Sequence, residues 1–312
     1  MSTKWRYAIE QTLIASKIIV YTTGSLSLLT ITGYSATQIY LERKEPTPGE
    51  WSFASRILLR TSRLSERWTA DDRNALTYSR AALERSGSTN GFGFAEAKAR
   101  MARAELRLGH IESAKEHFSE ALRAEEEGDY NKNFSPSRVS DSCRRLGTIY
   151  EELGEQEQAL RLLWRAVDLL KPSTMKEALI PEDEHPSPQL LDACTSLALC
   201  LAKQNDLPHS LAIFLTVLRA RKQPGARFGA GNVCQLALVE AYLGEVYWGL
   251  NNAEQATEWT QSAFNRASSV KSSSCVQCSR LAGNNLAIMF EKRGDVEQAA
   301  LWRTRAVGLP AG

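Results

Sequence analysis

The sequence predicts an all-α fold built from stacked helical hairpins, and two observations carry this prediction. The stretch from Cys143 to Val167 reads as two amphipathic helices joined by a tight turn at residues 153–155. Five segments of the 312-residue chain, one of which contains this stretch, share the same order of small and bulky residues. Because a single hairpin cannot bury its apolar face alone, several hairpins are expected to stack on one another.

The hairpin at 143–167 shows which side chains are expected to pack. The residues predicted to face each other across its two helices are Leu146, Gly147, Tyr150, Ala159, Leu163 and Ala166. Small residues at Gly147 and Ala159 let two helix backbones approach closely, while Tyr150 and Leu163 fill the space beside them. These positions are therefore assigned to packing rather than to function.

The N-terminal part of the chain predicts a membrane anchor. Residues 1–17 form a short basic segment, and residues 18–41 contain no charged side chain. As a helix, the uncharged segment would reach roughly 36 Å at about 1.5 Å per residue, enough to cross a hydrocarbon core of ~30 Å. A surface helix of this length in a soluble protein would carry charges along one face. We expect a single transmembrane helix at 18–41; the alternative is a buried or disordered N-terminal arm.

The charges on either side of this segment predict its orientation. Lys4, Arg6 and Lys17 precede it, whereas the charges of residues 41–45 balance. The excess of positive charge places the N-terminus inside and the bulk of the chain outside. Residues 42–50 contain Pro and Gly and are expected to be a linker that is not helical.

Residues 51–312 are expected to form one helical-repeat domain. Its first pair, 51–68 and 69–85, lacks the shared pattern and reads as a degenerate repeat or a cap. The clear repeats lie near 94–127, 140–170, 190–221, 237–267 and 280–307. The repeat at 190–221 is diverged, because Leu201 stands where Tyr is usual and Asn205 where Gly is usual.

Composition and motifs give little support for catalysis, cofactors or nucleic acid. The net charge is only +2, which argues against binding to a nucleic acid. The chain contains no His-Glu-x-x-His, no phosphate-binding Gly/Lys loop and no Gly-x-Ser-x-Gly, so we expect no enzyme, no cofactor and no metal. Cys275 and Cys278 form a single Cys-x-x-Cys, which is weak support for zinc without a second pair. A local disulfide or plain packing is the expectation, and the redox state of the pair stays open.

The candidate partner-binding surface is the face lined by the first helix of each hairpin, as in other helical solenoids. Counting from the repeat pattern, its candidate residues are Arg103, Arg144, Thr148, Glu151, Leu199, Glu245, Trp248, Asn284 and Ile288. Trp248 is a candidate anchor for a partner; the alternative is that it packs against the fifth repeat.

The hairpins at 94–127, 140–170, 237–267 and 280–307 resemble tetratricopeptide (TPR) repeats, which place Leu-Gly, Tyr, Ala, a bulky residue and Ala in this order. The resemblance implies a TPR-like α-solenoid of about five to six hairpins, here preceded by one transmembrane helix. TPR proteins bind other proteins rather than catalyse reactions.

The whole layout resembles a narrower family, the fungal TPR adaptor of the mitochondrial i-AAA protease. The match lies in the basic N-terminus, the single span, the linker into residues 51–60 and the long-period repeats. It implies a single-pass protein of the mitochondrial inner membrane, with the N-terminus in the matrix and the repeats in the intermembrane space. Such a protein would bind an AAA protease complex and its unfolded clients in protein quality control. The alternatives are an assembly or structural factor for a respiratory or import complex, and the membrane of another organelle.

Overall fold

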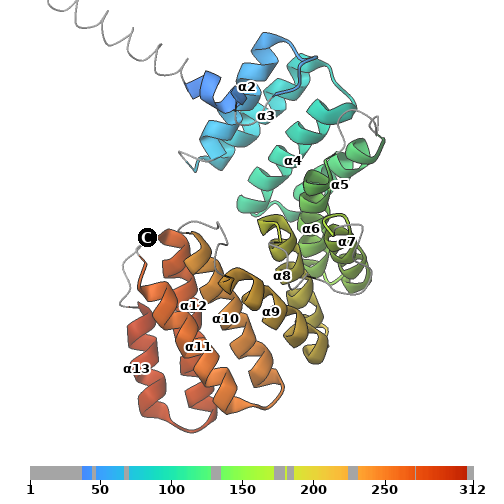
Figure 1. Ribbon diagram of the computed structural model, residues 1–312. Coiled ribbons are helices and arrows are strands. Elements are labelled where there is room, and N and C mark those ends of the chain that lie inside the picture. The colour runs from blue at the N-terminus through green and yellow to red at the C-terminus, as the bar shows by residue number, and fades with distance from the viewer. Residues whose placement is uncertain are drawn as a thin grey trace, which may run out of the picture. The chain divides into compact units, whose positions relative to one another are not determined.

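The computed structural model describes residues 37–43, 47–66, 70–127, 135–171, 180, 186–223, 231–270 and 272–307, and all their regular elements are helices (Figure 1). The helices, in chain order, are α2 (Phe53–Leu64), α3 (Asp72–Ser86), α4 (Gly91–Arg107), α5 (Ile111–Glu127), α6 (Pro136–Glu152), α7 (Gln156–Asp168), α8 (Pro188–Lys203), α9 (Leu207–Lys222), α10 (Gly231–Gly249), α11 (Ala253–Ser268), α12 (Ser273–Lys292) and α13 (Val296–Val307). A further short helix spans residues 37–43. The predicted all-α fold is confirmed.

The expected membrane span lies outside the described residues, except for residues 37–41. None of the helices that the structure describes has the length and apolar character needed to cross a bilayer. The end of the predicted span is engaged elsewhere: Leu41 is buried, and Arg60 of α2 donates a hydrogen bond to the carbonyl oxygen of Gln38 at 3.4 Å. Glu42 forms an ion pair with Arg56 of the same helix. Gln38 and Glu42 therefore contact α2 and Leu41 is buried, whereas the side chains of Ile39 and Tyr40 are exposed.

The chain divides into two compact units, residues 1–117 and 118–312. Unit 1 contains α2, α3, α4 and the first part of α5. Its apolar core includes Trp51, Leu59, Ala82 and Ala97, and the hydroxyls of Ser62 and Ser79 bond at 2.6 Å between α2 and α3. Unit 2 contains the rest of α5 and the helices from α6 to α13.

The same backbone turn follows α4, α6, α8, α10 and α12. In each turn one residue has a positive φ, between 60° and 83°; these residues are Gly109, Gly154, Asn205, Asn251 and Gly294. The next amide closes each turn on a carbonyl oxygen five residues earlier, as in Glu155 to Tyr150 at 2.8 Å. Asn adopts this left-handed conformation more readily than other residues with a side chain. Asn205, which marks the diverged repeat in sequence, therefore forms the same turn as Gly154.

The small residues do bring the helices of a hairpin close together. A Cβ atom added at Gly147 would lie 2.8 Å from Cγ of Leu163 and 3.3 Å from the carbonyl oxygen of Ala159. At Gly244 the same atom would clash with Oγ1 of Thr260 on α11. Both glycines therefore occupy helix contacts that leave no room for a side chain.

A disulfide joins Cys234 of α10 to Cys275 of α12, 41 residues apart in sequence. Of the two alternatives for Cys275 and Cys278, the local disulfide is therefore wrong, and Cys278 is a buried free thiol beside the bridge. The Cys-x-x-Cys spacing misleads because helix packing places α10 nearer to Cys275. Cys143 and Cys194 are buried free thiols as expected, and burial raises the pKa of each to about 12.

Candidate functional site

The helices α6, α8, α10 and α12 are the first helices of the four hairpins in unit 2, and polar contacts link them in two pairs, α6 with α8 and α10 with α12. We call the surface that carries these contacts the first-helix face. Lys203 at the end of α8 forms an ion pair with Glu151 of α6, and Asn285 of α12 donates a hydrogen bond to Glu245 of α10 at 2.6 Å. Side chains from four different hairpins therefore contribute to one surface.

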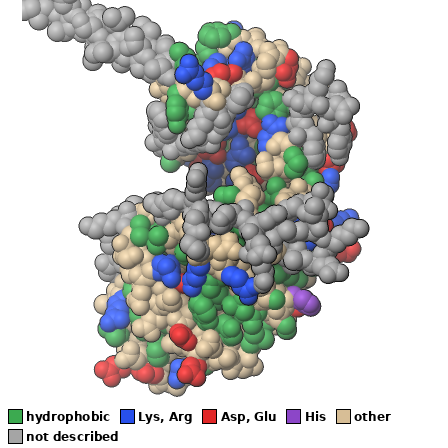
Figure 2. Space-filling model, viewed as in Figure 1, with side chains coloured by type: hydrophobic (Ala, Val, Ile, Leu, Met, Phe, Trp, Pro, Cys, Tyr) green, Lys and Arg blue, Asp and Glu red, His purple; other side chains and the backbone are tan. Residues whose placement is uncertain are grey.

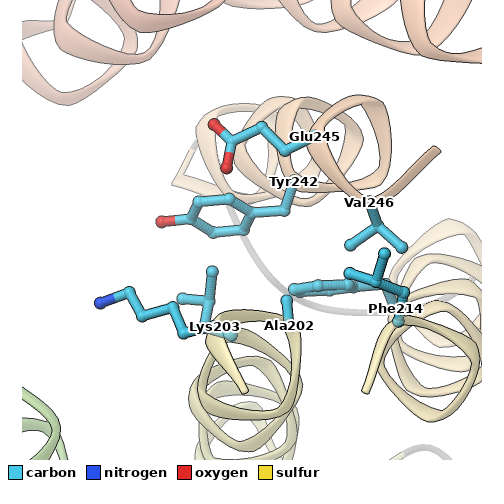
Figure 3. A pocket seen from close by; sticks show the side chains of 8 residues that line it. Ala202, Lys203, Phe214, Tyr242, Glu245 and Val246 are labelled. Carbon is cyan, nitrogen blue, oxygen red and sulfur yellow. The ribbon is translucent and has the colours of Figure 1, made fainter. Parts of the chain in front are cut away.

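A pocket of about 200 Å³ opens on this face between α8, α9 and α10 (Figure 3). The side chains that line it are Leu199, Ala202, Lys203, Leu207, Phe214, Tyr242, Glu245 and Val246. In Figure 3 the ammonium of Lys203, the hydroxyl of Tyr242 and the carboxylate of Glu245 point to the same side, away from Val246 and Phe214. The pocket thus has an apolar interior and a polar mouth.

Two aromatic rings form part of the apolar interior. The centroids of Phe214 and Tyr242 lie 5.6 Å apart, with the rings tilted by 30°, within the range of favourable aromatic pairs. Burial raises the pKa of Tyr242 to about 12, and the negative charge of Glu245 adds to this shift. Tyr242 is therefore a neutral hydroxyl at physiological pH. On the face of unit 2 seen in Figure 2, hydrophobic side chains gather over the region that Figure 1 labels α9 and α10.

Glu245 has less charge compensation than Glu151. Solvent still reaches its side chain, but the surrounding protein desolvates the carboxylate and raises its pKa above the ordinary value. The hydrogen bond from Asn285 and the more distant charge of Lys203 offset this shift only in part. Among the described residues, Glu245 has no ion-pair partner.

The charge of Glu151, in contrast, is compensated by a directly bonded cation. Its side chain is 8% exposed, and it takes the ammonium of Lys203, which is 62% exposed, as its ion-pair partner. Glu151 also accepts a hydrogen bond from the thiol of Cys200, whose pKa burial and this neighbour raise to about 11. The ammonium at the mouth of the pocket is therefore paired with a carboxylate that lies beside the pocket rather than in its lining.

The structure brings three of the predicted residues together. Leu199 and Glu245 line the pocket, and Glu151 is joined to it through Lys203. On α12, Asn284 and Ile288 are exposed, Ile288 to 48%, and Trp248 of α10 is half-buried. These three side chains are on the helices of the first-helix face but do not line the pocket.

The remaining predicted residues make contacts away from the pocket. Thr148 donates to the carbonyl oxygen of Arg145 in its own helix at 2.7 Å, and Arg144 pairs with Asp141 at 2.7 Å. Arg103 lies in unit 1, where its guanidinium is 3.3 Å from the carboxylate of Glu66.

Arg103 belongs to a cluster of ion pairs that joins α4 to Arg63 of α2 and to Glu66, just after the end of α2. Glu96 contacts the buried guanidinium of Arg100 at 2.6 Å and that of Arg63 at 3.5 Å. Burial alone would raise the pKa of Glu96, but the charges of Arg100, Arg103 and Arg63 outweigh it and lower the pKa to about 2. The same arginines of α4 lower the pKa of Glu66 against its own burial. This cluster therefore fixes α4 on α2.

Sequence reasoning missed most residues of the site, among them Lys203, Leu207, Phe214, Tyr242, Val246 and Asn285. Lys203 could have been found, because it lies four residues after Leu199 and so on the same side of α8. Phe214 comes from a second helix, and the repeat pattern assigns second helices to packing. Among the described residues no group of three or more His, Cys, Asp or Glu is arranged to hold a metal ion.

Comparisons with solved structures give the fold. The apo form of RapI matches with a TM-score of 0.60 and 16% identity, covering 89% of each chain. BtubC from P. vanneervenii matches with a TM-score of 0.56 and 15% identity, over 78% of this chain and 90% of that one. A Rap protein complexed with Competence and Sporulation Factor matches with a TM-score of 0.60 and 12% identity, over 82% of this chain and 63% of that one. Neither the protein-family models nor the curated proteins give a match. The chain has a TPR-like helical-repeat fold.

Proposed function

We propose that this chain is a non-catalytic scaffold that holds a segment of a partner protein on the first-helix face of unit 2. The observation that carries the proposal is the pocket between α8, α9 and α10, with an apolar interior and charged side chains at its mouth. Binding sites are typically apolar hollows with a few polar groups that orient the ligand. The face also continues across four hairpins, so an extended segment has further contacts on either side of the pocket.

The fold of the solved neighbours supports this proposal. A Rap protein of the same fold was solved in a complex with Competence and Sporulation Factor, so the fold can hold another factor. Stacked repeats generally present one continuous binding surface.

The scaffold is proposed to be anchored in a membrane through its N-terminal segment. Because Gln38 and Glu42 contact α2 and Leu41 is buried, the span would end before residue 37 rather than at residue 41. Residues 18–36 as a helix would reach about 28 Å at about 1.5 Å per residue, close to the ~30 Å hydrocarbon core. The ion pair of Glu42 with Arg56 would then connect the anchor to unit 1 with little slack.

We further propose the narrower role that the layout suggests, an adaptor of the i-AAA protease. The protein would lie in the mitochondrial inner membrane with its repeats in the intermembrane space, and would deliver unfolded clients. The uncharged segment after a basic N-terminus and the apolar pocket both fit this role, because an unfolded client exposes apolar side chains.

Capture of partners by the full-length protein tests the scaffold. Ala202→Arg would place a long charged side chain in the pocket, and Ala300→Arg makes the same change at an exposed position of α13. We expect the protein from detergent-solubilised mitochondria to carry an AAA protease and client proteins, to lose the clients with Ala202→Arg, and to keep them with Ala300→Arg. Equal capture by both variants would contradict the proposed surface.

The membrane topology and the adaptor role need a second experiment. A C-terminal tag should resist added protease in intact mitochondria and be degraded once the outer membrane is ruptured. In cells that lack the protein, unfolded inner-membrane proteins should be degraded more slowly. Co-migration with a respiratory or import complex, with normal turnover of those proteins, would favour the assembly factor instead.

A further inference from the structure

The mouth of the pocket carries an excess of negative charge. Lys203 and Glu245 are the charged residues among those that line it, and Glu151, which lies beside the pocket without lining it, pairs with the ammonium of Lys203. The ammonium is held by Glu151, whose side chain is 8% exposed. Glu245 is left with the neutral amide of Asn285 as its hydrogen-bond donor among the described residues, at 2.6 Å.

The carboxylate of Glu245 is only partly compensated when the pocket is empty. The surrounding protein desolvates the carboxylate of Glu245 and raises its pKa, which means that the charged form is undercompensated. A positively charged group of a ligand would compensate the charge of Glu245. A partly desolvated carboxylate gains most from a positive group that is bonded to it directly. Glu245 remains open to solvent, so such a group can reach it.

The apolar interior of the pocket determines which side chain of a ligand can enter it. Leu199, Leu207, Phe214 and Val246 offer apolar surface, and the Tyr242 ring packs against Phe214. An apolar cavity of about 150 Å³ is known to hold a benzene ring. A pocket of about 200 Å³ therefore has room for the side chain of a Leu, Met or Phe.

We propose that the pocket takes an apolar side chain of a partner peptide while Glu245 binds a Lys or Arg beside it in the same peptide. The ligand class is thus a segment with an apolar anchor next to a basic residue. Segments in which an acidic residue flanks the anchor bind more weakly, because Glu245, which has no ion-pair partner among the described residues, repels them. This inference rests on the proposed function and names the class of segment that the same surface selects.

An array of synthetic peptides tests this selectivity with the detergent-solubilised full-length protein. Each peptide has a Gly/Ser background and a central pair that combines Leu, Met, Phe or Ser with Lys, Arg, Gln, Asp or Glu. We expect the apolar–basic pairs to bind about two- to fivefold more strongly than the apolar–acidic pairs, the range for an ion pair near a surface. Pairs with Ser should bind no better than background.

Variants of Glu245 separate charge selectivity from folding. Glu245→Gln should bind basic and acidic pairs equally, and Glu245→Lys should prefer the acidic pairs. Because Gln can still accept the hydrogen bond of Asn285, Glu245→Gln should keep the melting temperature of the wild type. Glu152→Gln, the same change at an exposed position of α6 outside the pocket, should leave the preference unchanged.

The outcomes distinguish this inference from the proposed function. Binding that Ala202→Arg abolishes, but that shows no preference for basic pairs, overturns the inference alone. A preference for basic pairs that survives in Glu245→Lys also overturns it. Binding that is insensitive to Ala202→Arg contradicts the proposed function as well.

Discussion

Lys203 at the end of α8 pairs with Glu151 of α6, 52 residues earlier in the chain. The carboxylate is 8% exposed and the ammonium 62% exposed, so the pair connects two successive hairpins at the border between protein and solvent. The same ammonium lies at the mouth of the apolar pocket. One contact thus serves the stacking of the repeats and the electrostatics of the candidate site.

Lys203→Met should lower the free energy of unfolding by about 1–2 kcal/mol. The variant keeps the aliphatic part of the side chain but leaves the carboxylate of Glu151 nearly buried without its cation, which costs more than the loss of an exposed pair. Urea unfolding measures the change. Adding Glu151→Gln to Lys203→Met should recover much of the loss, and equal stability of the single variant and the wild type would contradict the account.

Gly147→Ala should destabilise the fold by about 1–3 kcal/mol, the usual cost of an overpacked contact. The new Cβ would lie 2.8 Å from Cγ of Leu163, within a fully buried hairpin contact. Gly49→Ala is the matched control, because no atom lies within 4 Å of the added Cβ there. Thermal or urea unfolding of the two variants compares them directly, and equal effects would mean that the close approach at Gly147 does not limit the packing.

Loss of the bridge between Cys234 and Cys275 should lower the free energy of unfolding by about 2–4 kcal/mol, the range expected when a disulfide no longer constrains the unfolded chain. Mass spectrometry of the oxidised protein should find the two cysteines in one cross-linked peptide pair. Cys278→Ser should leave this cross-link in place, since Cys278 is a free thiol. A cross-link between Cys275 and Cys278 instead would contradict the observed pairing of α10 with α12.

The ion-pair cluster of unit 1 should make the free energy of unfolding depend on pH in the acidic range. The charges of Arg100, Arg103 and Arg63 lower the pKa of Glu96 from 4.5 to about 2 in the folded protein. A lowered folded pKa stabilises the fold above the unfolded pKa, and this contribution is lost as the pH falls from about 4.5 to about 2. Urea unfolding at several pH values should show a steeper loss in this window for the wild type than for Glu96→Gln. Parallel curves for the two proteins would exclude Glu96 as the titrating group.

Local features of the fold could be predicted from the sequence, because the repeat pattern is local. The turn at Gly154 and the close contact of Gly147 with Leu163 follow from spacings within one hairpin. Asn205 shows the limit of a pattern read by residue type: it departs from the consensus and still forms the same turn, because the backbone conformation rather than the identity of the residue is repeated.

The candidate site could be predicted only in part, because its contacts join distant hairpins. Leu199 and Glu245 follow from the rule that first helices line the binding face, but Phe214 comes from a second helix. The pairing of Cys234 with Cys275 and that of Glu151 with Lys203 depend on how neighbouring hairpins stack. The repeat period of the sequence predicts neither pairing, because it does not give the register between one hairpin and the next.

The central claim is that partners bind on the first-helix face of unit 2. A photo-crosslinking amino acid at Ala202, in the pocket, tests it against the same amino acid at Arg161, which is 72% exposed on the second helix α7. In intact mitochondria we expect irradiation to link position 202, but not position 161, to the client proteins that the full-length protein captures. Crosslinks to those clients from position 161 alone would contradict the account.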